Sequence, residues 1–223
     1  MAVSWFRICC LALLMGSCTV GAQTGTHASS SSRSGAKRAA AEGSSGFDAG
    51  SIVNGVYRNR ALGLACKIPA GWVLRTEEMN SEEGSDEQDP QRQKTAGETK
   101  GQRVLLAAFS RPPDARGEDI NGSILIARES VSAYPGLKEA AQYFGPLTEV
   151  AKAQGFAVDE EPYEFAVGSR NLVRGDFHKD VGTRVMRQST LAFLAQGFAI
   201  SITVIGGTED EVEELIDGVS FAK

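Results

Sequence analysis

Four consecutive strand-length segments in the C-terminal half of the chain constrain the fold more than any other feature. They span residues 162–168, 171–179, 184–193 and 197–206, and they are rich in aromatic and β-branched side chains. The connections between them are short and contain glycine, as hairpin connections do. The sequence therefore predicts a four-stranded antiparallel meander.

Helical periodicity appears on both sides of this meander. Residues 135–155 carry apolar side chains at helical spacing, but Pro146 lacks an amide donor, so we expect a kink or two helices meeting there. Residues 208–218 predict a second helix, because Thr208 and Glu211 have the spacing of a capping box. Helices on either side of an antiparallel block indicate an α+β fold.

The segment Gly63 to Trp72, "GLACKIPAGW", contains a strand with one buried face. Leu64, Cys66 and Ile68 fall at every second position, so we expect the Cys66 side chain to point into the core. There a thiol behaves as a small apolar group, and burial raises its pKa. Further strands are predicted from the apolar segments at residues 103–110 and 122–130.

The N-terminal residues have the composition of an export signal. An apolar run after Arg7 has the length of a signal-peptide core and is too short to cross a bilayer. Two processing sites compete: cleavage after Ala22, or lipidation of Cys18 in the lipobox-like "MGSC", where Met15 stands in the usual place of leucine. Either route removes or modifies every cysteine before Cys66, so the mature chain has no intramolecular disulfide; an intermolecular or reactive thiol is the alternative to a buried one.

Composition divides the rest of the chain. We predict a signal peptide over residues 1–22, a flexible Ser/Gly/Ala-rich linker over 23–50, and one α+β domain over 51–223. Residues 77–102 form a polar, acidic insertion that we interpret as a disordered, solvated loop. It lacks the alternating carboxylates and central glycine of a calcium loop, so we expect no metal site.

A polar cluster lies within the predicted meander. Arg174, Asp176 and His178 are spaced by two, so they share one face of a strand, and a tight turn after Lys179 would place Arg187 across from Asp176. These four side chains could hold an anion or act as acid and base. The alternative is a solvated strand face with a cross-strand ion pair.

The order of these elements resembles the PsbP-like family, whose fold is shared by the Ran-binding Mog protein and the envelope lipoprotein DcrB. The resemblance rests on residues 55–72, "GVYRNRALGLACKIPAGW", on the meander ending "QSTLAFLAQGFAISITV", and on the short C-terminal helix. It implies an antiparallel β-sheet with helices packed on its faces, an αβα sandwich. It also implies a binding or accessory module rather than a catalyst, with no catalytic residues to carry over. The long acidic insertion departs from the family's short turn.

Charge and motifs narrow the function. The net charge of −5 provides no basic field for nucleic acid, and the phosphate loop, the nucleophile elbow and the His-Glu-x-x-His helix are absent from the sequence. We therefore predict an exported bacterial protein, periplasmic or extracellular, that binds or assists an unknown envelope protein without catalysis or cofactor. Its contact with the membrane would be through a lipid on Cys18. The alternative is a small-ligand sensor or enzyme that uses the cluster around His178.

Overall fold

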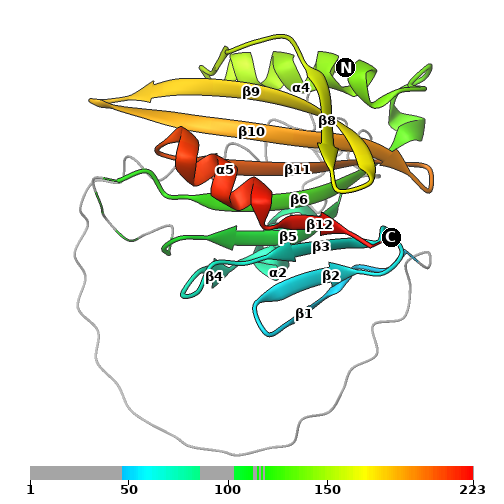
Figure 1. The fold of residues 1–223 in the computed structure, drawn as a ribbon, viewed down its shortest axis with the longest axis horizontal. Coiled ribbons are helices and arrows are strands. Elements are labelled where there is room, and N and C mark those ends of the chain that lie inside the picture. Colours follow the sequence, from blue (N-terminus) through cyan, green and yellow to red (C-terminus); the bar gives the residue numbers. More distant parts are fainter. Residues whose placement is uncertain (1–46, 86–102, 113–114, 116, 118, 223) are drawn as a thin grey trace, which may run out of the picture.

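The computed structural model describes residues 47–85, 103–112, 115, 117 and 119–222. The predicted leader with its two processing sites, most of the linker, and residues 86–102 of the acidic insertion lie outside these residues. Within them the chain forms two antiparallel sheets, and helices pack alongside (Figure 1). The predicted α+β fold, with helices on the faces of an antiparallel sheet, is confirmed.

The smaller sheet has four strands in the order β1-β2-β3-β12. Their bounds are Ser51–Val53, Val56–Asn59, Leu64–Lys67 and Val219–Phe221. The larger sheet has the order β4-β5-β6-β11-β10-β9-β7, with β8 also paired to β9. Its strands, from β4 to β11 in chain order, are Val73–Leu74, Arg103–Phe109, Ser123–Ser130, Ala157–Val158, Tyr163–Val167, Arg170–Val181, Arg184–Ala195 and Phe198–Gly206.

The predicted meander is present as β8, β9, β10 and β11, each antiparallel to the next. The turn between β9 and β10 consists of Gly182 and Thr183, and the φ of +62° at Gly182 places glycine where a tight hairpin turn needs it. This turn lies further along the chain than we predicted. The register consequently places Arg187 opposite His178, and Asp176 opposite Ser189, so the predicted pairing of Arg187 with Asp176 is wrong.

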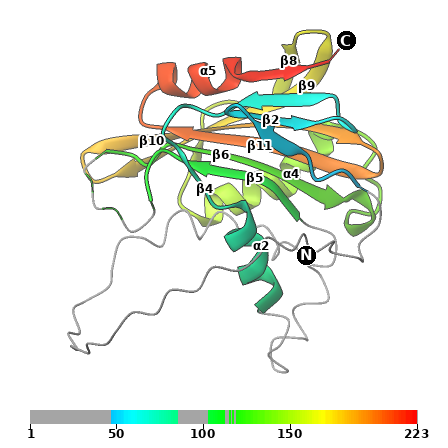
Figure 2. The same ribbon diagram turned by 90° about the horizontal axis from the view of Figure 1, so that it is seen from below.

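Three α-helices are described, α2 (Thr76–Ser85), α4 (Ala140–Ala153) and α5 (Glu209–Asp217), together with a short 3-10 helix, η2, at Val131–Ala133. α4 runs through Pro146 as one helix, so the expectation of two helices is wrong. Its buried face packs against the sheet on both sides of the proline, through Phe144 and Leu147 among others. Figure 2 shows α5 and α4 on opposite faces of the larger sheet.

α2 corrects the prediction that residues 77–102 are all loop. Residues 77–85 belong to this helix, which Met79 anchors by its buried side chain. The Asn80 amide bonds both backbone groups of Val104, at 3.0 and 3.1 Å, and the Thr76 hydroxyl accepts from the Ala107 amide at 2.9 Å. These contacts are made with β5, which is distant in the sequence. The polar sequence of residues 77–85 by itself therefore did not predict a helix.

The ordered domain begins before the predicted linker boundary at residue 50. Phe47 packs edge to face on Phe198 with ring centroids 5.0 Å apart. Asp48 accepts hydrogen bonds from the amides of Gly50 and Arg60 at 2.9 and 3.1 Å. Residues 47–50 are therefore part of the packed structure, and the linker prediction is wrong for these four residues.

The main core lies between the two sheets and beneath α5, and it contains Leu64, Cys66 and Ile68 as predicted. Cys66 is fully buried, and burial raises the pKa of its thiol to about 12. The interpretation of Cys66 as a packed, unreactive side chain is therefore supported. No helix in the described part of the chain is long and apolar enough to cross a membrane.

Candidate functional site

Arg174 and Asp176 lie on the face of the larger sheet that α5 covers. The Arg174 Nε donates to both carboxylate oxygens of Asp176, at 2.9 and 3.0 Å. The guanidinium also bonds the Glu213 carboxylate on α5, with Nη1 at 3.2 Å from one oxygen and Nη2 contacting the other. Arg174 is therefore engaged by two carboxylates from different elements.

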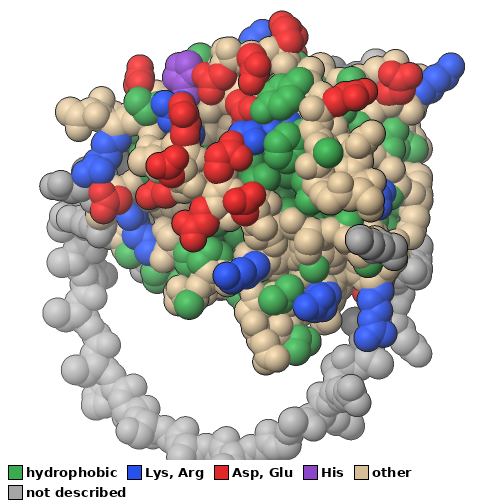
Figure 3. Space-filling model, in the orientation of Figure 1, with side chains coloured by type: hydrophobic (Ala, Val, Ile, Leu, Met, Phe, Trp, Pro, Cys, Tyr) green, Lys and Arg blue, Asp and Glu red, His purple; other side chains and the backbone are tan. Residues whose placement is uncertain are grey.

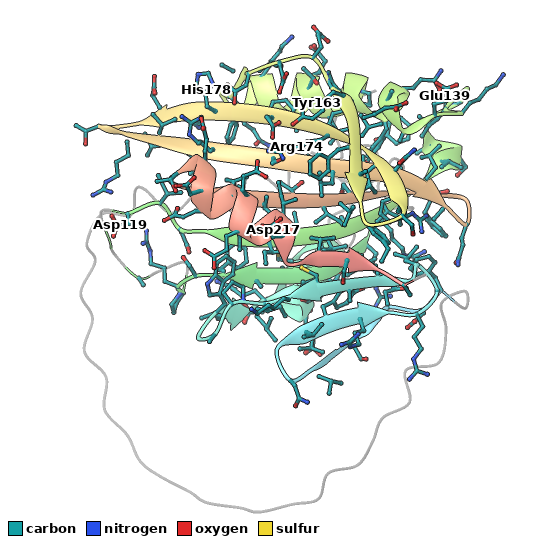
Figure 4. The ribbon with its side chains drawn as sticks, viewed as in Figure 1. Asp119, Glu139, Tyr163, Arg174, His178 and Asp217 are labelled. Atoms are coloured by element: carbon teal, nitrogen blue, oxygen red, sulfur yellow. The ribbon has the colours of Figure 1, made fainter. Side chains whose placement is uncertain are left out.

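β8 closes the other side of this network. The Tyr163 hydroxyl donates to Asp176 at 2.9 Å, and the Phe165 ring centroid lies 5.1 Å from the Arg174 guanidinium carbon. Figure 4 labels Tyr163 on β8 and Arg174 on β9. Burial and the hydrogen bond to Asp176 raise the pKa of Tyr163 to about 12. Burial acts to lower the pKa of Arg174, but the bonds to Glu213 and Asp176 outweigh it and hold that pKa above its ordinary value. Arg174 remains a cation that ties β8, β9 and α5 together.

His178 and Arg187 lie toward the hairpin end of the same two strands. The His178 Nδ1 contacts the carboxylate of Asp159, which follows β7. The Arg187 Nη1 lies 3.0 Å from Glu209 Oε1 at the start of α5. Both side chains are partly exposed, 39% for His178 and 33% for Arg187, so their pairs are weaker than that of Arg174.

The structure thus distributes the four predicted site residues over separate ionic contacts. Arg174 and Asp176 are joined directly, while His178 and Arg187 are cross-strand neighbours that pair with Asp159 and Glu209 respectively. The described contacts include no hydrogen bond between these two groups. Arg174–Asp176 lies within β9, whereas the pairs of Arg174 with Glu213, of His178 with Asp159 and of Arg187 with Glu209 link β9 or β10 to α5 or to the residues after β7, which is a structural role. Action of the four on a shared ligand stays a prediction.

Carboxylates dominate the surface above this network. Figure 3 shows Asp and Glu side chains gathered over α5 and toward the β8 and β9 strands. We define the acidic face as nine exposed residues of α5, β8 and the β7–β8 connection: Asp159, Glu160, Glu161, Glu164, Glu209, Asp210, Glu213, Glu214 and Asp217. Three of them pair with a basic group, namely Asp159, Glu209 and Glu213, and the other six form no ion pair with a described residue.

The distribution of charge along α5 is asymmetric. Acids in its first turn favour the helix dipole, and the Thr208 hydroxyl caps the helix by accepting from the Glu211 amide at 3.1 Å, as the sequence predicted. The last turn carries Glu214 and Asp217 and has no basic residue, although the dipole there disfavours negative charge. The negative charges of these two acids are therefore unfavourable for the stability of α5.

Sequence reasoning missed the partners of the predicted cluster. Glu213, Tyr163 and Asp159 are separated from Arg174 or His178 by turns and whole elements, so no spacing in the sequence connects them. For Tyr163 the sequence contained one signal that could have indicated its position: the alternation in β8 places its side chain on the same face of the strand as Phe165. Within the described residues no group of three His, Cys, Asp or Glu side chains has a metal-binding arrangement.

Comparison with known proteins leaves the family open. No family model matches the chain, and no curated protein matches it. The resemblance to the PsbP-like family therefore stays a prediction.

Among solved structures, the protein of unknown function PA94 from Pseudomonas aeruginosa is 17% identical, with a TM-score of 0.33 over 45% of this chain and 67% of its own. LpqN, involved in cell envelope biogenesis of Mycobacterium tuberculosis, is 12% identical, with a TM-score of 0.35 over 72% of this chain and 83% of its own. A protein from Bacteroides thetaiotaomicron is 11% identical, with a TM-score of 0.35 over 72% of this chain and 45% of its own.

Proposed function

We propose that this chain is an exported, non-catalytic binding or accessory protein of the bacterial cell envelope, and that its acidic face contacts a basic partner. Export rests on the leader, whose short apolar run and competing processing sites at Ala22 and Cys18 are typical of secreted or lipid-anchored proteins. The acidic face is the single observation that carries the choice of partner.

The non-catalytic assignment follows from how the polar residues are used. Arg174 pairs with both Asp176 and Glu213, and Arg187 is paired with Glu209. A general acid or base needs a proton-accepting atom directed at a substrate, whereas these groups are directed at one another. We therefore assign them to holding α5 and β8 on the sheet.

The acidic face suits a cationic surface or peptide. Six carboxylates there have no basic partner among the described residues, so their summed field extends into solvent. The cost of placing Glu214 and Asp217 at the negative end of α5 favours a role outside folding, because stability alone would favour basic residues there. Such a surface attracts a basic partner by long-range steering and loses affinity in salt.

The test compares two charge-matched double variants. Glu214→Gln/Asp217→Asn removes two charges from the acidic face, and Glu77→Gln/Glu149→Gln removes two exposed charges from α2 and α4. Binding of a fluorescent oligolysine peptide is measured for each at low and physiological salt. We expect binding to the acidic-face variant to weaken about tenfold, which corresponds to about 0.7 kcal/mol for each of the two charges removed. Equal binding by the two variants would contradict the proposal.

Partner capture from envelope extracts uses the same three proteins. A partner that is recovered with the wild type and the control, and is lost with Glu214→Gln/Asp217→Asn, is assigned to the acidic face. Intact mass of the exported protein separates its two forms: a diacylglyceryl modification on Cys18 indicates an anchored protein, and an N-terminus at Gln23 indicates a released one. Retention of residues 1–22 in the mature protein would contradict export.

A further inference from the structure

Arg128 on β6 is a buried arginine that has no hydrogen-bond or ion-pair partner in the described part of the chain. Its side chain lies on the core face of the larger sheet, and the residue is 8% exposed. The Nε is fully enclosed and has no hydrogen-bond partner, and Arg128 forms no hydrogen bond or ion pair with any residue that the structure describes. Burial of an unpaired cation is costly, so its retention requires a reason.

Two aromatic rings supply part of that reason. The Arg128 guanidinium carbon lies 4.5 Å from the Phe47 ring centroid and 4.4 Å from that of Phe198, and the two centroids are 5.0 Å apart. The guanidinium carbon and the two ring centroids thus form a nearly equilateral triangle. The guanidinium packs against the edge-to-face ring pair and is not sandwiched between two parallel rings. The rings favour a cation but accept no conventional hydrogen bond, so the nitrogens of Arg128 remain unsatisfied by them.

A second arginine lies directly beside Arg128. Arg103, the first residue of β5, is its cross-strand partner, and Ile200 is the partner on β11. Like charges directly opposite one another repel, and neither neighbour supplies a carboxylate. Burial and the charge of Arg103 both lower the pKa of Arg128, which agrees with two neighbouring cations that form no ion pair with a described residue.

We propose that Arg128 and Arg103 form a binding site for an oxyanion, the carboxylate or phosphate group of a small ligand, with Phe47 and Phe198 as its apolar wall. The planar guanidinium can donate two parallel hydrogen bonds to such a group. An anion bound there would satisfy the unpartnered donors of Arg128 and remove the repulsion across β5 and β6. This site is separate from the acidic face, so it stands or falls independently of the proposed function.

Calorimetric titration of the purified chain with inorganic phosphate, and separately with acetate, tests this site. Ionic strength is held constant with sodium chloride, so that general screening does not change during the titration. Three variants are compared. Arg128→Gln removes the buried donor, Arg103→Gln removes the exposed one, and Arg58→Gln removes an exposed arginine of β2 as a matched control.

We expect saturable binding of at least one of the two anions to the wild type and to Arg58→Gln. Binding should weaken about tenfold or more in Arg128→Gln and in Arg103→Gln, because each loses charge-assisted hydrogen bonds to the anion. The preferred anion identifies the ligand group as carboxylate or phosphate. Arg103→Gln keeps the test decisive if Arg128→Gln does not fold. Absence of saturable binding, or equal weakening in Arg58→Gln, would overturn the proposal and leave Arg128 as a hydrated cation on an aromatic pair.

Discussion

Two arginines on the core face of the larger sheet have the same burial and opposite surroundings. Arg174 and Arg128 are each 8% exposed, and aromatic side chains contact both. Arg174 meets two carboxylates, Asp176 and Glu213, whereas Arg128 meets none among the described residues and faces Arg103 across the strands. Burial by itself therefore does not indicate what a charged side chain does.

The two arginines therefore differ in what their charge can do: the donors of Arg174 are occupied by carboxylates of the protein, and those of Arg128 are not occupied by any described residue. Partners supplied by β9 and α5 make Arg174 part of the folded scaffold, so its removal leaves the largely buried carboxylate of Asp176 without its cation. Arg128 lacks such partners among the described residues, so we assign its compensation to solvent or to a ligand. The four predictions that follow test this contrast, from the largest expected effect to the smallest.

Replacement of Arg174 by methionine has the largest expected effect. Asp176, whose side chain is 16% exposed, would lose its cation, and the link between β9 and α5 would be lost. We expect the free energy of unfolding to fall by about 3 kcal/mol in a urea titration. A loss below about 1 kcal/mol would show that this network does not hold α5 on the sheet.

Replacement of Tyr163 by phenylalanine tests the same network through pH. At neutral pH the lost hydrogen bond to Asp176 should cost about 1 kcal/mol of unfolding free energy. The pKa of Tyr163 is raised to about 12 in the folded state, so its contribution is complete below the ordinary pKa of about 10 and is lost as pH rises toward 12.

The stability gap between wild type and Tyr163→Phe should therefore narrow over this alkaline range. Urea titrations at several pH values measure it. A gap that widens with pH would show that the folded state stabilises the phenolate instead.

Replacement of Arg128 by methionine should cost far less than the same change at Arg174. Loss of the contact with Phe47 and Phe198 is offset by removal of an unpaired buried charge, so we expect a change within about 1 kcal/mol in anion-free buffer. The comparison is made by urea titration of both methionine variants side by side. A loss as large as that of Arg174→Met would contradict the contrast between the two arginines.

Replacement of Asp217 by asparagine should have the smallest effect, and it should be stabilising. Removal of a negative charge from the last turn of α5 favours the helix dipole by about 0.5 kcal/mol. Asp210→Asn, in the first turn, is the matched control and should destabilise by a similar amount. Both are measured by thermal unfolding at low salt, and the same sign for the two variants would show that the dipole does not explain their cost.

The sequence predicted those features of the fold that local chemistry determines. Alternation identified the strands and the burial of Cys66, and capping spacing identified the start of α5 at Thr208. It failed where contacts distant in sequence decide the outcome. α2 forms because Met79 and Asn80 contact β5, and the smaller sheet as a second layer required a pairing of β3 with β12 that no local pattern shows.

The candidate sites were less predictable than the fold. Alternation placed Arg174, Asp176 and His178 on one face, but one displaced turn moved Arg187 away from Asp176. The Arg128 site was not predicted at all. It depends on Phe47, which composition assigned to a linker, and on the register of β5 against β6, which a bulge between Val104 and Leu106 shifts.

Nuclear magnetic resonance of the arginine side chains tests the central contrast most directly. The Nε–Hε signals of Arg128 and Arg174 are followed in one sample while phosphate, and then acetate, is added at constant ionic strength. We predict a saturable shift of the Arg128 signal with either anion or both, while the Arg174 signal stays in place because Asp176 and Glu213 already occupy its donors. An unmoved Arg128 signal with both anions, or shifts of the two arginines in parallel, would contradict the account.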